Sequence, residues 1–160
     1  MRQAALLFFL VPHYQNFNKR LLETPKLFYT DTGLVAWLLG IGSPEQIATH
    51  PQFGALFETF VVGEFLKSRL NRGLEPRLSF WQARTGHEVD LLLERGDKLL
   101  PVEVKAGKTV VPDYFQILDF WGTMTGRKEK GGIVYGGAEP GIKGPWRVVP
   151  WKRLGKSLTE

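Results

Sequence analysis

The chain has 160 residues, of which 43% are hydrophobic and 23% are charged, and these values predict one globular domain and exclude a disordered, fibrous or coiled-coil chain. The net charge of +5 favours polyanionic partners such as nucleic acid. Because the chain contains no cysteine, disulfides, thiolate catalysis and cysteine-ligated zinc are excluded, and we expect a cytoplasmic protein.

The N-terminal stretch "MRQAALLFFLVPHY" places eight apolar residues, 4–11, after Arg2 and so resembles a signal peptide. It lacks the small-residue cleavage site of a signal peptide. A transmembrane helix needs about 20 apolar residues, and no window of the chain supplies them. We therefore expect no membrane partner and interpret residues 4–11 as a buried strand or the end of a helix.

Three helices are predicted in the first half of the chain. Asp31 or Thr32 can cap a short helix that runs through Leu39 and stops at Gly40. The Ser-Pro pair at residues 43–44 forms the cap and first turn of a second short helix. A long helix within "PQFGALFETFVVGEFLKSRLNRG", residues 51–73, has an apolar stripe at helical spacing and a glycine at its end.

The second half of the chain reads mainly as strands. Three strand-like runs, "RLSFWQA", "EVDLLLE" and "KLLPVEVKA", are joined by turn-prone segments and predict an antiparallel meander. A helix at residues 112–124 and strands within 131–136 and 146–151 follow. The predicted fold is therefore α/β, with a mixed sheet flanked by helices.

Charged side chains interrupt the strands at residues 88–94 and 98–106. With the period of two of a strand, Glu88, Asp90 and Leu92 share one face, and Val89 and Leu91 share the other. If the strands pair through a turn centred on residues 96–97, the first strand brings its aspartate opposite a glutamate of the second. Like charges in such a position are unfavourable unless a cation lies between them.

The partner of Asp90 in this pairing is Glu103, which shares a face with Lys105. Two carboxylates with open positions for water and phosphate suit Mg²⁺ or Mn²⁺, and a nearby lysine can orient water or stabilise charge on a phosphate. We therefore predict phosphodiester hydrolysis, with Asp90 and Glu103 as metal ligands. The long helix offers two further carboxylates, Glu58 at the edge of its apolar stripe and Glu64 within it.

The segments "NKRLLETPKLFYTDTGLVAWLLG", "GALFETFVVGEFLK" and "HEVDLLLERGDKLLPVEVKAGK" resemble, in that order, the uncharacterised C-terminal domain of many prokaryotic AAA-type ATPases. The helix glutamate, the aspartate and the Glu-x-Lys triplet also resemble the PD-(D/E)XK nuclease superfamily, although Val89 replaces its proline.

This resemblance implies a restriction-endonuclease-like αβββαβ core over residues 25–155. Its active-site positions fall on Glu58, Asp90, Glu103 and Lys105, and its substrate is DNA. It also implies an ATPase module upstream, but the chain contains no G-x-x-x-x-G-K-[ST] motif, so residues 1–24 are interpreted as a remnant extension of an upstream domain.

Several alternatives remain open at this level. Glu58 can pair with a basic residue such as Lys19 or Lys26, and Glu88 can be a structural carboxylate at the rim. The domain can also be a nuclease-like module that no longer cuts and that binds nucleic acid or a protein. Placement of Asp90 and Glu103 on opposite faces of the sheet would overturn the nuclease interpretation.

Overall fold

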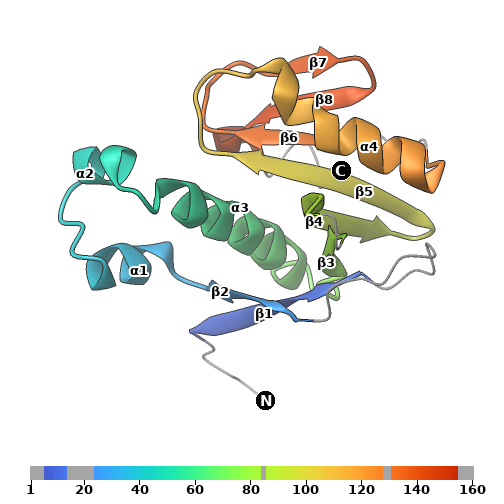
Figure 1. Cartoon of the computed structure of the whole chain (residues 1–160). Coiled ribbons are helices and arrows are strands. Elements are labelled where there is room, and N and C mark those ends of the chain that lie inside the picture. The colour runs from blue at the N-terminus through green and yellow to red at the C-terminus, as the bar shows by residue number, and fades with distance from the viewer. Residues whose placement is uncertain (1–5, 14–23, 84–85, 128–130, 155–160) are drawn as a thin grey trace.

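The computed structural model describes residues 6–13, 24–83, 86–127 and 131–154. Within them, eight strands form one mixed sheet in the order β2-β1-β3-β4-β5-β6-β8-β7, with helices against it (Figure 1). The strands are β1 Leu7–Pro12, β2 Lys26–Tyr29, β3 Leu78–Gln82, β4 Glu88–Arg95, β5 Lys98–Lys105, β6 Gly132–Tyr135, β7 Gly141–Lys143 and β8 Trp146–Pro150. The helices are α1 Thr32–Leu38, α2 Pro44–Thr49, α3 Phe53–Leu70 and α4 Gln116–Thr125, and the 3₁₀ turns are η1 Pro112–Phe115 and η2 Trp151–Arg153. The predicted α/β class, with a mixed sheet flanked by helices, is confirmed.

Two helices cover the two faces of the sheet. On the face that we call the α3 face, Phe57, Val61, Val62 and Phe65 of α3 pack against a set of strand residues that includes Leu91, Leu93, Val102, Val104 and Val134. On the other, the α4 face, Leu118 and Trp121 of α4 pack against residues that include Val89, Leu92, Leu99, Ile133 and Tyr135. The central strands β4, β5 and β6 are therefore covered on both sides, which explains their nearly continuous apolar sequences.

The predicted helix boundaries are largely confirmed, and the cap of α1 is Asp31. Its side chain accepts hydrogen bonds from the backbone N–H groups of Gly33 at 2.8 Å and Leu34 at 3.2 Å. These bonds satisfy two of the donors that a helix start leaves free. Gly40, with φ +72°, supplies the left-handed turn after the helix.

The strand β1 covers most of the apolar N-terminal stretch, whose residues 4 and 5 lie outside the described part of the chain. The strand is buried only at Leu10 and Pro12, while Val11 between them is 50% exposed and Phe9 is 68% exposed, so the expectation of a buried strand holds only for one side of it. It pairs antiparallel with β2 and parallel with β3. No helix in the described ranges combines the length and the apolar character that crossing a membrane requires.

The hairpin of β4 and β5 has the predicted register, since Leu91 pairs with Val102 and Leu93 with Leu100. The predicted alternation of faces fails at the start of β4. There, Leu92 pairs with Ser79 of β3, whereas Val89 pairs with Trp81, so two residues of β4 lie opposite the single residue between them.

This irregularity is a β-bulge in β4 that places Asp90 and Leu91 together opposite Phe80 of β3. Because the bulge adds one residue, Val89 packs on the α4 face while Leu91 packs on the α3 face, although a regular strand would put both on one face. Glu88, which precedes the bulge, and Asp90, which lies in it, are therefore turned to the opposite face from the one predicted.

Two glycines test the packing of this architecture. Gly63 is buried in α3 and a Cβ there would meet no atom within 4 Å, whereas a Cβ on Gly132 of β6 would collide with the Arg147 carbonyl oxygen of β8. We expect Gly63→Ala to stabilise the fold by about 0.5–1 kcal/mol through helix propensity. Gly132→Ala should destabilise it by about 1–3 kcal/mol through overpacking. Urea denaturation measures both, and a similar shift in the two variants would contradict this packing.

Candidate functional site

The strands β4 and β5 part next to Asp90. Their last registered pair is Leu91 with Val102, and beyond it β4 continues along β3 while β5 continues along β6. The Val104 N–H, which has left the ladder to β4, donates to Asp90 Oδ2 at 2.8 Å. The Asp90 carboxylate thus satisfies a backbone donor at the point where the ladder stops. We call this place, with Asp90 on one strand and Glu103 on the other, the fork.

Three carboxylates meet on the α3 side of the fork. One carboxylate oxygen each from Glu58 of α3 and from Glu88 and Asp90 of β4 lie within 4.8 Å of one another. We call these three residues the carboxylate cluster. All three are partly buried. The long helix thus brings Glu58 to the strand carboxylates as predicted, and Glu88 joins it because the bulge turns the start of β4 toward α3.

Lys26 of β2 places its ammonium group in the carboxylate cluster. Its Nζ donates to Glu58 Oε1 at 3.1 Å and also to Glu88 Oε1, and it lies 5.3 Å from the centre of the Phe80 ring. Phe28, two residues along β2, is buried on the α3 face, so alternation turns Lys26 to the same face. The alternative in which Glu58 pairs with Lys26 is therefore confirmed, while Lys19 lies outside the described residues.

Glu103 and Lys105 form a second ion pair at the fork. Glu103 is only 5% exposed, its Oε1 accepts from Lys105 Nζ at 2.6 Å, and its Oε2 has no hydrogen-bond partner among the described residues. Lys105 Nζ lies 5.7 Å from the centre of the Tyr114 ring in η1. A buried carboxylate oxygen without a partner costs free energy unless something positive or donating approaches it.

The expectation that Asp90 and Glu103 share one face of the sheet is wrong, so the condition that overturns a nuclease site with these two residues as joint metal ligands is met. Along β5, Val102 and Val104 pack on the α3 face, and Glu103 alternates with them. Ile133, which pairs with Glu103 across β5 and β6, packs on the α4 face. Glu103 and Lys105 therefore leave the sheet on the α4 side. Asp90 lies with Glu58 on the α3 side because the bulge in β4 turns it over.

The two carboxylates nevertheless influence each other across the fork. Burial raises the pKa of Asp90 well above its usual value, and the charges of Glu103 and Glu58 raise it further. Burial also raises the pKa of Glu103, against the opposing effect of the Lys105 ammonium. The metal-free protein therefore keeps a proton on these acids to a higher pH than the free side chains do.

Both lysines are held in their charged form. Burial works to lower the pKa of Lys26, but Glu58 and Glu88 outweigh it and raise the pKa. The same balance holds for Lys105, where burial is outweighed mainly by Glu103, so its pKa is raised. Each side of the fork thus has a carboxylate and an ammonium in direct contact.

Glu64 takes no part in this arrangement. It is partly buried, as expected, but its carboxylate accepts from Lys67 Nζ at 3.2 Å along α3. It also lines a shallow depression with Phe60 and Trp151 rather than the fork. Its place within the apolar stripe is therefore not a sign of contact with Asp90.

The donor set of the carboxylate cluster fits a hard divalent cation. Mg²⁺ takes oxygen ligands at about 2.1 Å in octahedral geometry, so neighbouring ligand oxygens lie roughly 3 Å apart and opposite ones roughly 4 Å apart. The oxygens of Glu58, Glu88 and Asp90, within 4.8 Å of one another, would move toward the ion to reach these separations. These residues would hold the ion.

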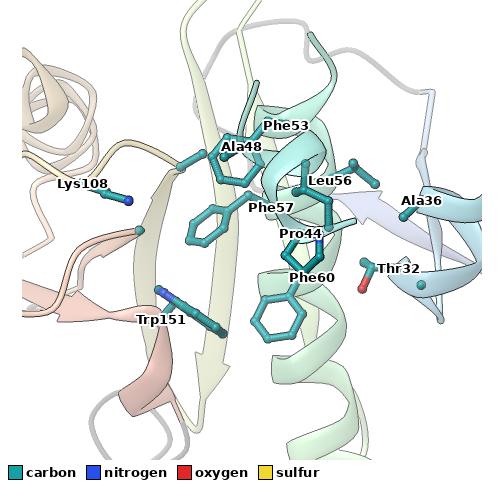
Figure 2. Close-up of a pocket in the computed structure, with 14 residues that line it drawn as sticks. Thr32, Ala36, Pro44, Ala48, Phe53, Leu56, Phe57, Phe60, Lys108 and Trp151 are labelled. Carbon is teal, nitrogen blue, oxygen red and sulfur yellow. The ribbon is translucent and has the colours of Figure 1, made fainter. Parts of the chain in front are cut away.

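An apolar pocket of about 510 Å³ lies beside the site, between α1, α2, α3 and the 3₁₀ turn η2 (Figure 2). The rings of Phe57, Phe60 and Trp151 border it, and Lys108 lies where the chain leaves β5. A concave apolar pocket is an ordinary default for ligand binding. Its lining contains no carboxylate, so it does not suit the metal and phosphate chemistry that the fork suits.

Comparisons with known proteins identify a family. Residues 53–154 match the model of a family described as a domain of unknown function, DUF4143. Two uncharacterised proteins, one from Mycobacterium bovis and one from Mycobacterium tuberculosis, are each 33% identical to the chain over 101 residues. This match covers 62% of the chain but 22% of either relative, so it spans about a fifth of their length. No solved structure matches the chain.

The predicted resemblance to an uncharacterised domain is therefore confirmed, and the nuclease assignment stays a prediction. The matched stretch contains Glu58, Glu88, Asp90, Glu103 and Lys105, but not Lys26. Sequence reasoning recognised Lys26 only as a neutralising partner. The one signal in the sequence was its position two residues before Phe28 in a short apolar run.

The raised pKa of Asp90 predicts how stability depends on pH. Because the folded protein holds this proton more tightly than the unfolded chain, the free energy of unfolding should fall as pH rises from about 4 through the folded pKa of Asp90. Asp90→Asn removes this loss and keeps an oxygen for the Val104 N–H. We expect it to melt at the same or a higher temperature than the parent at pH 7–8 in EDTA, with the advantage shrinking toward pH 5.

Melting curves between pH 5 and pH 8 check this expectation, with Asp97→Asn in the exposed β4–β5 turn as the matched control. Glu103, whose pKa is also raised, should leave part of the pH dependence in the variant. If Asp90→Asn is less stable by about 1–3 kcal/mol throughout this range, Asp90 is a structural carboxylate whose hydrogen bond dominates.

Proposed function

We propose that this chain, which belongs to the DUF4143 family of domains of unknown function, is a nuclease that hydrolyses DNA with Mg²⁺ or Mn²⁺. The observation that carries the proposal is that the carboxylate cluster on the α3 side and the Glu103–Lys105 pair on the α4 side both lie at the fork, close enough that the charge of Glu103 raises the pKa of Asp90. These four acids and the lysine come from one helix and two strands. Such a concentration of partly buried negative charge is expensive without a cation and is typical of functional sites.

In this proposal the ion is held by Asp90, Glu58 and Glu88. When bound, it would polarise a phosphoryl oxygen and lower the pKa of water at the site. Asp90 would bind as the carboxylate, since the ion would offset the burial and the neighbouring negative charges that raise its pKa. Glu103 was predicted as a ligand from the sequence, and its place on the α4 side suits a different role, which is to orient Lys105.

Lys105 is the residue that we assign to the phosphate. Its ammonium is held charged by Glu103 and stays 32% exposed, so it can donate to a phosphate oxygen or orient a water molecule. An ammonium placed where negative charge develops in the transition state is a common source of rate enhancement.

The order of the elements supports the restriction-endonuclease-like part of the proposal. From α3 onward the chain runs α3, β3, β4, β5, α4 and β6, which is the αβββαβ order that the PD-(D/E)XK resemblance implies. The acids and the lysine fall on the first helix and the second and third strands of this series. Membership of that superfamily remains part of the proposal.

Charge supports nucleic acid as the substrate. Besides the net charge of +5, Arg69, Arg72, Arg95 and Arg147 lie close enough that burial and the other three arginines lower the pKa of Arg95. Clustered arginines suit the phosphates of a polyanion.

We also propose that an ATPase module accompanies this domain in longer proteins. The two mycobacterial relatives are about five times longer than the matched stretch, which leaves room for such a module.

A second candidate function is a nuclease-like module that binds nucleic acid or a protein without cutting. The observation that favours it is the position of Glu103 on the α4 side, because the metal site predicted from the sequence required Asp90 and Glu103 on one face of the sheet. The two candidates differ in one measurable property, which is metal-dependent cleavage.

Cleavage of plasmid DNA and of single- and double-stranded oligonucleotides, with Mg²⁺ and with Mn²⁺, tests the proposal. We expect Lys105→Ala and Asp90→Asn each to lower the rate by about a hundredfold or more, the usual cost of losing a group that stabilises transition-state charge. Lys98→Ala, an exposed lysine at the far end of β5, should cleave like the parent. Retained DNA binding without cleavage by the parent would favour the second candidate.

A further inference from the structure

Lys26 places its ammonium beside the oxygens that would hold a metal ion. Its ammonium contacts Glu58 and Glu88, and Asp90 is the third member of the same group of oxygens. The residue comes from β2, outside the stretch that the family model matches. It is thus a member of the site that neither the family match nor the predicted ligand set includes.

An ammonium and a divalent cation cannot share this space. Three carboxylates can carry three negative charges, and one ammonium offsets only one of them. A divalent ion held by the same oxygens offsets more charge and takes several oxygens at once, whereas an ammonium donates separate hydrogen bonds. The two cations also repel each other at such short range.

The position of Lys26 on an edge strand allows its ammonium to leave the carboxylate cluster. β2 is the edge strand of the sheet, and the Lys26 side chain is 24% exposed, so its ammonium is not enclosed by protein on all sides. A lysine stem has four methylene groups and can keep its packing while its head turns to water. The contact of Lys26 Nζ with the Phe80 ring, whose centre is 5.3 Å away, is made while the ammonium lies inside the cluster.

We propose that Lys26 is a built-in counter-cation of the metal site, which holds the carboxylate cluster in the metal-free protein and leaves it when a divalent ion binds. This inference depends on the proposed function, because it takes the carboxylate cluster to be a metal site. It assigns to Lys26 a positioning role. Lys26 preserves the spacing of Glu58 and Glu88 without metal, and its displacement weakens metal binding.

Two measurements on the full chain test the inference. The first is Mn²⁺ titration by calorimetry of the metal-free parent, Lys26→Met and the control Lys98→Met. We expect Lys26→Met to bind Mn²⁺ at least tenfold more tightly than the parent, because no ammonium has to leave, and Lys98→Met to bind like the parent. Without metal, Lys26→Met should melt at a lower temperature than the parent, since the cluster loses its counter-charge.

The second measurement uses the parent alone and so does not depend on the folding of a variant. The rate of acetylation of each lysine is followed by mass spectrometry with EDTA and with saturating Mn²⁺. Displacement of the ammonium should raise the rate at Lys26 at least threefold on Mn²⁺ binding, while the rate at Lys98 stays the same.

The possible outcomes separate this inference from the proposed function. Binding by the parent together with equal or weaker binding by Lys26→Met would overturn the inference and leave the metal site intact. An unchanged or lower rate of Lys26 acetylation in Mn²⁺-saturated parent would also overturn it, because the ammonium would then stay in the cluster. Absence of Mn²⁺ binding in both the parent and Lys26→Met would overturn the proposed function and the inference together.

Discussion

The parting of β4 and β5 beside Asp90 is the constraint on which the rest of the site depends. A continued ladder would pair the backbones and leave no room between the strands. Because the ladder stops after Leu91 and Val102, the Val104 N–H needs another acceptor, and the Asp90 carboxylate provides it. The Asp90 side chain therefore satisfies the backbone at the end of the β4–β5 ladder and is also a member of the carboxylate cluster. This hydrogen bond offsets part of the cost of burying the Asp90 carboxylate, whose pKa is raised well above the usual value by burial.

The fork divides its charges between the two faces of the sheet. On the α3 side Lys26 serves Glu58 and Glu88, and on the α4 side Lys105 serves Glu103. Among the described residues, no lysine forms a salt bridge with Asp90. Its carboxylate accepts a hydrogen bond from one backbone N–H, that of Val104. Asp90 is therefore the acid of the fork whose charge has the least compensation, and burial raises its pKa well above the usual value. If the carboxylate cluster binds a cation as proposed, Asp90 is the acid that gains most from the added positive charge.

Local patterns predicted the elements that depend on short-range information. The turn at residues 96–97 is short, so the register of β4 and β5 followed from counting, and the caps of α1 and α2 followed from their residue types. The strand β2 was missed because its four residues are too few for a period to appear. The bulge was missed because "EVDLLLE" alternates well enough to look regular, and one added residue reverses the face of everything before it.

The contribution of Lys26 could not be predicted for a different reason. Its partners Glu58 and Glu88 are 32 and 62 residues away, and only the order of strands in the sheet brings them together. β1 lies between β2 and β3, and its α3-face side chains Phe8 and Leu10 pack with Phe28 of β2. Lys26 pairs directly with Leu10 across these strands. The apolar N-terminal strand thus connects Lys26 to the fork, so the electrostatic state of the cluster depends on a segment that carries no charged group of the site. A domain reduced to the matched stretch 53–154 would keep every acid and Lys105 but would lose the cation that now balances Glu58 and Glu88.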